Sequence, residues 1–112
     1  MIDYTSLEKL IAIDSPSGFT HEACGFIVEE LTKLGYSPEL TTKGAVRCAL
    51  GESPKLAIAA HVDTLGAIVS GIKPEGILKF SVIGGLSLTG AEGEYVRIHT
   101  LEGKVFTGTI LL

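Results

Sequence analysis

An apolar run that ends in a histidine and an aspartate most constrains what this chain can fold into. Residues 56–60 are apolar at every position, and His61-Val62-Asp63 follows them directly. A strand with one wet face alternates apolar and polar residues, whereas a strand covered on both faces is apolar throughout. We therefore expect residues 56–60 to form a central strand with helices on both sides, in an α/β fold.

Two helices are expected before this strand. The segment Thr5-Ser6-Leu7-Glu8 has the S/T-x-x-E form of a capping box, which starts a helix. A second helix is expected to begin after Thr20 and to end at Gly35, with an apolar stripe at helical spacing. Residues 14–18 include a proline and a glycine, so they predict a loop between the two helices.

Strand patterns dominate the rest of the chain. Residues 45–50 alternate apolar and polar side chains and predict a strand at or near a sheet edge. Further on, a hairpin is expected from residues 66–72 and 77–83, and a second from residues 94–100 and 104–112. Together with the helices, these strands favour a chain that is α/β in its first part and β-rich in its second.

Composition excludes several classes of protein. The 112 residues are 46% hydrophobic, which is enough for a core and excludes intrinsic disorder. The 9 basic residues are scattered among 13 acidic ones, for a net charge of −4, so no nucleic-acid partner is expected. No apolar run is long enough to span a bilayer, and the first residues do not resemble a secretory signal. We expect a cytoplasmic protein in which Cys24 and Cys48 are free, buried thiols.

The last residues of the sequence are those of an apolar strand. Residues 109–112, Thr-Ile-Leu-Leu, include no glycine, proline or charge that would protect an exposed sheet edge. We therefore expect this chain to be part of a longer protein.

His61 and Asp63 are the residues with the clearest chemical potential. They follow the apolar run, at the edge where open α/β sheets bind ligands. A neutral imidazole can bind a metal, and a nearby carboxylate can fix its tautomer. The alternative is a histidine that only makes structural hydrogen bonds. His21 and His99 are expected to be bystanders, on a helix turn and on the polar face of a strand.

Several short motifs occur in an order that is more specific than any one of them. They are SPSG (15–18), GAV (44–46), AAHVDTLG (59–66), GILKF (76–80), IGG (83–85), EGEYVRI (92–98) and GKVFTG (103–108). In this order they resemble the N-terminal third of the dinuclear-metal glutamyl-aminopeptidase and tetrahedral-aminopeptidase family, some of whose members are labelled endoglucanases. The resemblance spans nearly the whole chain.

This resemblance implies a fold and a domain boundary. The family has an α/β/α zinc-peptidase domain that is interrupted by an inserted, barrel-like β-rich dimerisation domain. Residues 1–69 would then be an incomplete catalytic domain, and residues 70–112 would be the start of the inserted domain.

The resemblance also implies a site. His61 would be a ligand of one of two divalent metal ions, zinc or cobalt, and Asp63 would orient its ring. The other ligands and the general base would lie beyond residue 112, so this chain alone should hold no metal stably and should be inactive. The longer protein would be a homo-oligomer that removes N-terminal residues from peptides by means of a metal-activated water. Thr64 stands where the family more often has glutamate, which leaves the substrate preference open.

Two other functions stay open at this point. Residues 61–64, His-Val-Asp-Thr, also resemble the metal-binding segment of di-zinc carboxypeptidases and acylases. The hairpins that follow Gly66 favour the aminopeptidases. From a different class, the chain could be a β-rich interaction module without enzymatic activity that associates through its strand edges.

Overall fold

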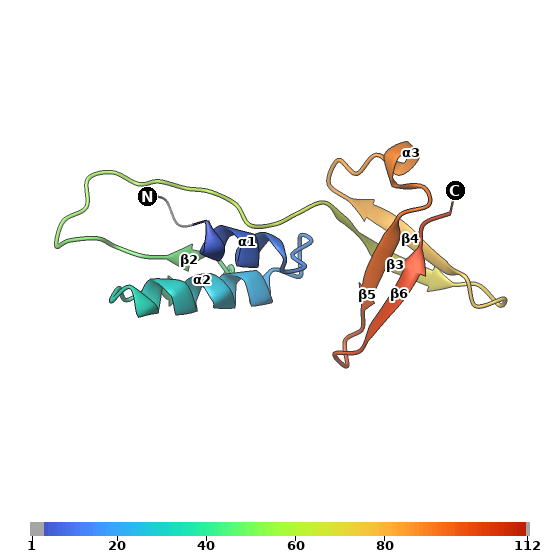
Figure 1. Cartoon of the computed structure of the whole chain (residues 1–112), viewed down its shortest axis with the longest axis horizontal. Helices are drawn as coiled ribbons and strands as arrows, with labels where there is room; N and C mark the ends of the chain where they lie inside the picture. Colours follow the sequence, from blue (N-terminus) through green and yellow to red (C-terminus); the bar gives the residue numbers. More distant parts are fainter. Residues whose placement is uncertain (1–3, 112) are drawn as a thin grey trace.

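The two longer helices occupy one end of the molecule, and two long β-hairpins with a short helix occupy the other, as Figure 1 shows. The computed structural model describes residues 4–111. The described part measures 58 × 33 × 24 Å and has a radius of gyration of 17.4 Å. A compact domain of this length would have a radius of gyration of about 13 Å. The two ends are therefore parts of an elongated molecule, joined by a long connection.

The helical end contains α1 (Thr5–Ile11) and α2 (His21–Lys33), which pack against each other. The predicted capping box is wrong by one residue, because the N-cap of α1 is Tyr4 and Thr5 is already helical. The predicted start of α2 after Thr20 is confirmed, although Thr20 makes no side-chain cap hydrogen bond.

Gly35 ends α2, as predicted. The N–H of Gly35 donates to the carbonyl of Thr32 at 2.9 Å, and the N–H of Tyr36 donates to that of Leu31 at 3.1 Å. These two bonds form a Schellman motif, which requires a positive φ at the residue after the cap. Gly35 has a φ of 87°, which glycine adopts without strain.

The strand predicted at residues 45–50 is shorter than expected and has an unpredicted partner. β2 (Val46–Arg47) pairs in antiparallel register with β1 (Glu39–Leu40) and contacts α2. Arg47 also forms an ion pair with Glu39. The sequence between α2 and residue 45 has no clear alternation, which is why β1 was missed.

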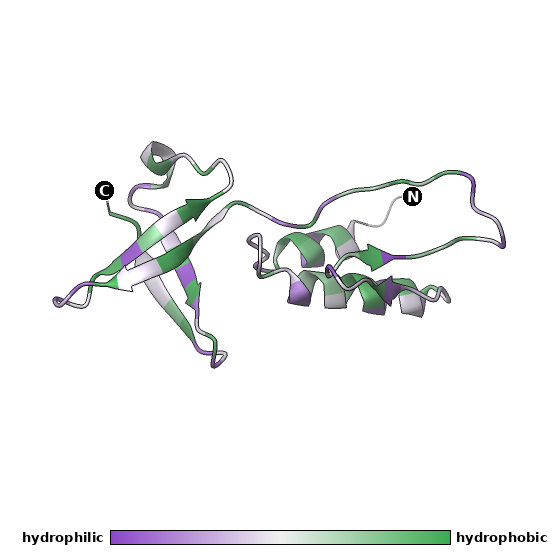
Figure 2. Cartoon of the chain, turned by 180° about the vertical axis from the view of Figure 1, so that it is seen from behind, coloured by the Kyte–Doolittle hydropathy of each residue, from purple (hydrophilic) through white to green (hydrophobic). Residues whose placement is uncertain are grey.

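The central strand expected at residues 56–60 is wrong for this structure. The segment has no regular secondary structure, and Leu56 and Ile58 are 79% and 91% exposed. A central strand needs hydrogen-bonded neighbours on both sides, and none of residues 4–111 supplies one. Figure 2 shows this apolar connection as an extended segment between the helices and the hairpins.

Both predicted hairpins are present. β3 (Gly66–Ile72) pairs with β4 (Leu78–Ile83), and β5 (Tyr95–His99) pairs with β6 (Val105–Thr109). A short helix, α3 (Leu88–Ala91), was not predicted and lies between the hairpins in sequence. The described residues thus form a mixed α/β structure of antiparallel strand pairs, and its three sheets have two strands each.

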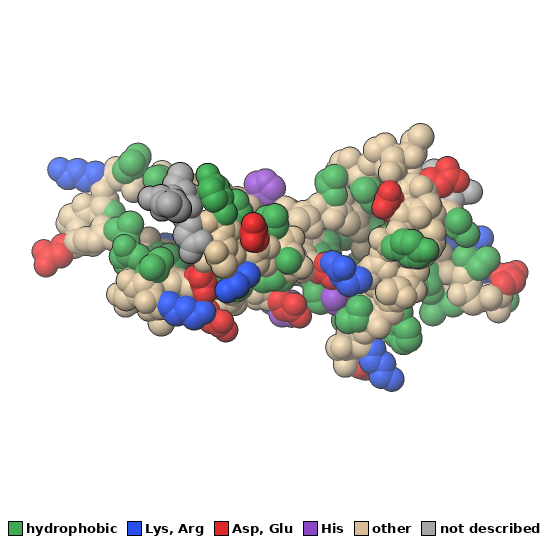
Figure 3. All heavy atoms as spheres, in the orientation of Figure 1, with side chains coloured by type: hydrophobic (Ala, Val, Ile, Leu, Met, Phe, Trp, Pro, Cys, Tyr) green, Lys and Arg blue, Asp and Glu red, His purple; other side chains and the backbone are tan. Residues whose placement is uncertain are grey.

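Little apolar surface is buried. The buried hydrophobic side chains among the described residues are Ala23, Cys24, Ala91 and Ile110. Figure 3 shows hydrophobic side chains open to solvent at both ends of the molecule. Both cysteines are free as predicted, but Cys48 is only half-buried. No helix within residues 4–111 is both long and apolar enough to cross a membrane.

Candidate metal site

Asp63 contacts one of the two ring nitrogens of His61, Nδ1. Nδ1 of His61 lies 3.0 Å from Oδ1 of Asp63 and 3.0 Å from its backbone oxygen. A carboxylate and a carbonyl oxygen can only accept hydrogen bonds, so Nδ1 carries the proton. Nε2 is then the nitrogen with the lone pair, on a side chain that is 84% exposed. This is the tautomer that a metal-binding histidine needs when its other nitrogen is held by a carboxylate.

The carboxylate of Asp63 has a second partner in a distant part of the sequence. The Ser17 hydroxyl donates to Oδ2 of Asp63 at 2.6 Å. This bond and, after it, the hydrogen bond from His61 lower the pKa of Asp63. Asp63 is therefore ionised at neutral pH, with one oxygen on Ser17 and the other on His61.

Ser17 reaches Asp63 because its loop is fastened to the segment that follows the histidine. The N–H of Thr64 donates to the carbonyl of Ser15 at 2.7 Å, and Pro16 and Thr64 form a parallel bridge. Gly66 completes the contact, since a Cβ built on it would lie 2.5 Å from Cβ of Pro16. Only glycine fits this close approach without movement.

The loop itself is a tight turn. The N–H of Phe19 donates to the carbonyl of Pro16 at 2.8 Å, and Gly18 has a φ of 88°. A positive φ at the third position of a β-turn favours glycine. The SPSG motif therefore encodes the turn that delivers the Ser17 hydroxyl.

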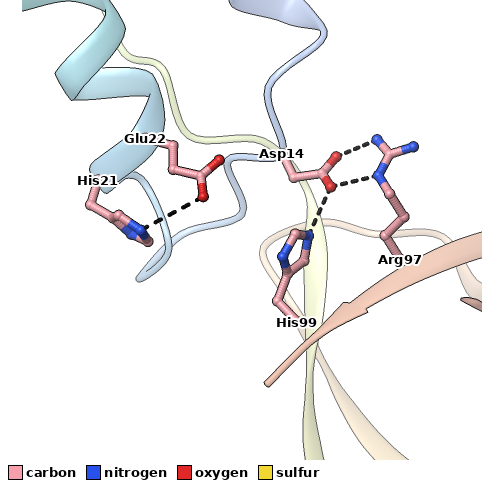
Figure 4. Close-up of polar contacts among 5 residues, drawn as sticks. All are labelled: Asp14, His21, Glu22, Arg97 and His99. Atoms are coloured by element: carbon pink, nitrogen blue, oxygen red, sulfur yellow. Dashed lines mark hydrogen bonds and ion pairs between the residues drawn. The ribbon is translucent and has the colours of Figure 1, made fainter. Parts of the chain in front are cut away.

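A second polar cluster joins this loop to β5, as Figure 4 shows. Arg97 donates one hydrogen bond to each carboxylate oxygen of Asp14, and its Nε lies 2.6 Å from Oδ2. Nε2 of His99 lies 2.8 Å from the same Oδ2, and the His99 ring contacts Phe19 at a tilt of 41°, with centroids 4.8 Å apart. We call Asp14, Arg97 and His99 the clasp. His99 was expected to be a bystander to the chemistry, and the structure gives it a structural role in this contact between the two ends of the molecule.

The clasp perturbs the acidity of its carboxyl group. The hydrogen bond from Arg97 is the largest cause that lowers the pKa of Asp14 to about 2, and partial burial opposes it. His21 lies apart from the clasp, exposed on the first turn of α2, with Nε2 4.0 Å from Oε1 of Glu22. This exposed position agrees with the role predicted for His21.

The residues present fit one ligand of a metal centre. Within residues 4–111, no three His, Cys, Asp or Glu side chains gather as a metal site. His61 offers an unprotonated Nε2 on an exposed ring, with Nδ1 already occupied. The described residues can thus contribute one nitrogen to a centre whose other ligands they do not contain.

Sequence reasoning missed Ser17 and the clasp for the same reason. Both join residues that are far apart in sequence: Ser17 and Asp63 are separated by 46 positions, and Asp14 and His99 by 85. The signal for Ser17 was its place in the SPSG motif beside the Pro-Gly turn. No comparable signal marks the clasp.

Comparison with known proteins shows the family of this chain. Residues 44–112 match the family model described as M42 glutamyl aminopeptidase. YhfE of Bacillus subtilis (strain 168) is 39% identical over 109 residues, which cover 95% of this chain and 32% of YhfE. The glutamyl aminopeptidase of Lactococcus lactis subsp. cremoris (strain MG1363) is 27% identical and is covered to 30%, against 90% of this chain.

A solved structure agrees with the fold. The structure of PhTET1-12s, a dodecamer, superposes with a TM-score of 0.86 and 26% identity over 97% of this chain and 33% of its own. The chain thus spans about a third of the length of the relatives it matches. The family match favours the aminopeptidases over the di-zinc carboxypeptidases and acylases. On this sequence match and this superposition, the chain belongs to the M42 glutamyl aminopeptidase family.

Proposed function

We propose that residues 1–112 are the N-terminal part of a metal-dependent aminopeptidase, which we call the longer protein. His61 is a metal ligand in this proposal, and Asp63 orients its ring. The observation that carries it is the contact of Nδ1 of His61 with two oxygens of Asp63, which leaves Nε2 free to bind a cation. Membership of the M42 family supports the choice of reaction.

A series of contacts positions the ring of His61. The Ser17 hydroxyl donates to Asp63, Asp63 accepts the proton of Nδ1 of His61, and Nε2 of His61 is left free on an exposed ring. When bound, two divalent metals, zinc or cobalt, would supply the Lewis acidity that activates water and polarises the peptide carbonyl. The remaining ligands and the general base belong to the part of the longer protein beyond residue 112.

The domain and assembly expectations are part of the same proposal. Residues 1–69 belong to an α/β/α catalytic domain, and residues 70–112 begin an inserted β-rich dimerisation domain. The longer protein is cytoplasmic, acts on peptides and forms a homo-oligomer. The dodecamer of PhTET1-12s and the unpaired outer edges of β3 to β6 support self-assembly.

The test compares two histidines in the longer protein. His61→Ala should lose one metal ion per subunit by elemental analysis and should lose hydrolysis of aminoacyl-nitroanilides. His21→Ala is the matched control, because His21 is also an exposed histidine but pairs with Glu22, and this variant should keep both the metal ions and the activity. Retention of both metals and of turnover in His61→Ala would contradict the ligand assignment. Full activity of residues 1–112 alone would contradict the division of the site.

A further inference from the structure

The carboxylate of Asp63 is divided between two partners, and each takes one oxygen. Oδ1 faces Nδ1 of His61, and Oδ2 accepts the Ser17 hydroxyl at 2.6 Å, the shorter of the two contacts. The Asp63 side chain is 44% exposed, so packing does not fix its orientation. The hydrogen bond from the Ser17 hydroxyl fixes the orientation of the Asp63 carboxylate instead.

We propose that Ser17 is a positioning residue that sets the tautomer of His61, by holding Asp63 so that Oδ1 accepts the proton of Nδ1. The proposal rests on the metal-ligand role proposed for His61. It assigns a function to a serine that lies 46 positions from Asp63 in sequence and does not contact the imidazole among the interactions described.

The chemistry behind this role is a choice between two neutral imidazoles. A histidine that is free in water prefers the proton on Nε2, and that form has no lone pair there for a metal. A hydrogen-bond acceptor at Nδ1 reverses this preference. If the Asp63 side chain rotates away, Nδ1 keeps only the backbone oxygen of Asp63, an uncharged acceptor 3.0 Å away, and the share of the Nε2–H form, which cannot bind a metal through Nε2, increases.

The backbone around Ser17 makes its hydroxyl a fixed donor. The bond from Thr64 to the carbonyl of Ser15 and the bridge between Pro16 and Thr64 join the two segments on either side of the contact. The turn closed by Phe19 then limits the movement of Ser17. The backbone thus fixes the position of the Ser17 hydroxyl, and this hydroxyl in turn fixes the orientation of the Asp63 carboxylate.

Ser15 provides a matched control in the same loop. Its side chain is buried, at 3% exposure, and its hydroxyl has no hydrogen-bond partner among the described residues. Removing that hydroxyl leaves the backbone carbonyl that binds Thr64. Ser15→Ala and Ser17→Ala therefore delete the same atom from the same loop, and only one deletion touches Asp63.

The experiment measures the tautomer directly, without metal or substrate. The 112-residue chain is labelled with ¹⁵N at histidine, treated with a chelator and studied by long-range ¹H–¹⁵N correlation at about pH 8, above the ordinary imidazole pKa of about 6.5. The His61 signals are assigned by their loss in His61→Gln. Wild type should show the Nδ1–H form, and Ser17→Ala should shift part of the population to Nε2–H, because Nδ1 then keeps only the Asp63 backbone oxygen as a fixed acceptor.

Two further variants complete the test. Ser17→Thr keeps a hydroxyl and should retain the Nδ1–H form, and Ser15→Ala should match wild type. The proposal is overturned if wild type shows the Nε2–H form, if Ser17→Ala keeps the wild-type share of the Nδ1–H form, or if Ser15→Ala lowers that share as much as Ser17→Ala. None of these readings uses bound metal, so they are separate from the metal analysis of His61→Ala, which tests the proposed function.

Discussion

The guanidinium of Arg97 on β5 donates hydrogen bonds to both carboxylate oxygens of Asp14, which lies 83 positions earlier in the loop after α1. Paired, parallel hydrogen bonds of this kind fix orientation as well as distance. His99 adds a third contact to the same carboxylate. The helical end and the hairpin end are thus joined by charge-assisted bonds, in a molecule that buries little apolar surface between them.

The clasp should make stability depend on acid pH. The pKa of Asp14 is lowered to about 2 in the folded chain, whereas an unperturbed aspartate has a pKa of about 3.9. Its contribution is therefore fully present above about pH 4 and is lost as the pH falls towards 2. We expect the difference in urea midpoint between wild type and Asp14→Asn to narrow over this range. A difference that stays constant from pH 5 to about pH 2 would rule out this contribution.

Arg97→Ala should loosen the attachment of the loop to β5 without unfolding either end. Hydrogen exchange monitored by mass spectrometry should become faster in residues 14–19 and 95–99. Arg47→Ala is the control, since Arg47 forms an exposed ion pair with Glu39 within one small sheet. It should leave exchange in those two segments unchanged, and equal effects of both variants would contradict the clasp.

Gly66→Ala should be destabilising by roughly 1–3 kcal/mol, the usual cost of forcing an added carbon into a close contact. The added Cβ would meet Cβ of Pro16 at 2.5 Å, and the fastening of the SPSG loop would have to shift. Gly71→Ala on the same strand is the comparison, because nothing lies within 4 Å of its Cβ position. Chemical denaturation of the two variants checks the difference, and similar midpoints would be evidence against the contact.

Asp63→Asn should weaken metal binding in the longer protein by roughly 10-fold to 100-fold, the range for residues that orient a metal-binding histidine. An amide can present its NH₂ group to Nδ1, and it has no charge to hold the proton there. Competition with a chelator measures the affinity. Unchanged affinity would remove Asp63 from the proposal while leaving His61 in it.

The 112-residue chain should self-associate. Large hydrophobic side chains are exposed along the connection and on the hairpins, among them Leu56, Ile58, Ile72 and Phe106. Surfaces of this kind associate in water. Sedimentation at micromolar concentration should show oligomers, and Ile58→Glu should shift the distribution towards smaller species. A monomer at all concentrations would favour the self-contained interaction module over the part of a larger enzyme.

Local features were predictable from the sequence, and contacts between distant segments were not. The α2 helix, its end at Gly35 and both long hairpins depend on periodicity and on glycine at turns, which act within a few residues. The apolar run at residues 56–60 failed as a strand because its form depends on neighbouring strands, and the described residues provide none.

The candidate site divides in the same way. Both His61 and Asp63 were singled out from the sequence, but their spacing alone could not show that the two side chains touch, which the structure shows. The clasp and the Ser17 bond need the folded path of the backbone, which periodicity does not specify. His99 and Arg97 alternate with the apolar Val96 and Ile98 on β5, so the pattern predicted the face that His99 shares with Arg97 but not its partner Asp14.

The clasp joins residues that are synthesised at different times. During synthesis Asp14 is made 83 residues before Arg97, which at about 5–20 residues per second is a delay of roughly 4 to 17 s. Helices and hairpins form within microseconds, so α1 and α2 are complete long before Arg97 is available to bind Asp14 in the loop after α1. The contact between the two ends therefore forms only after Arg97 has been synthesised, and until then the SPSG turn must keep its shape without it.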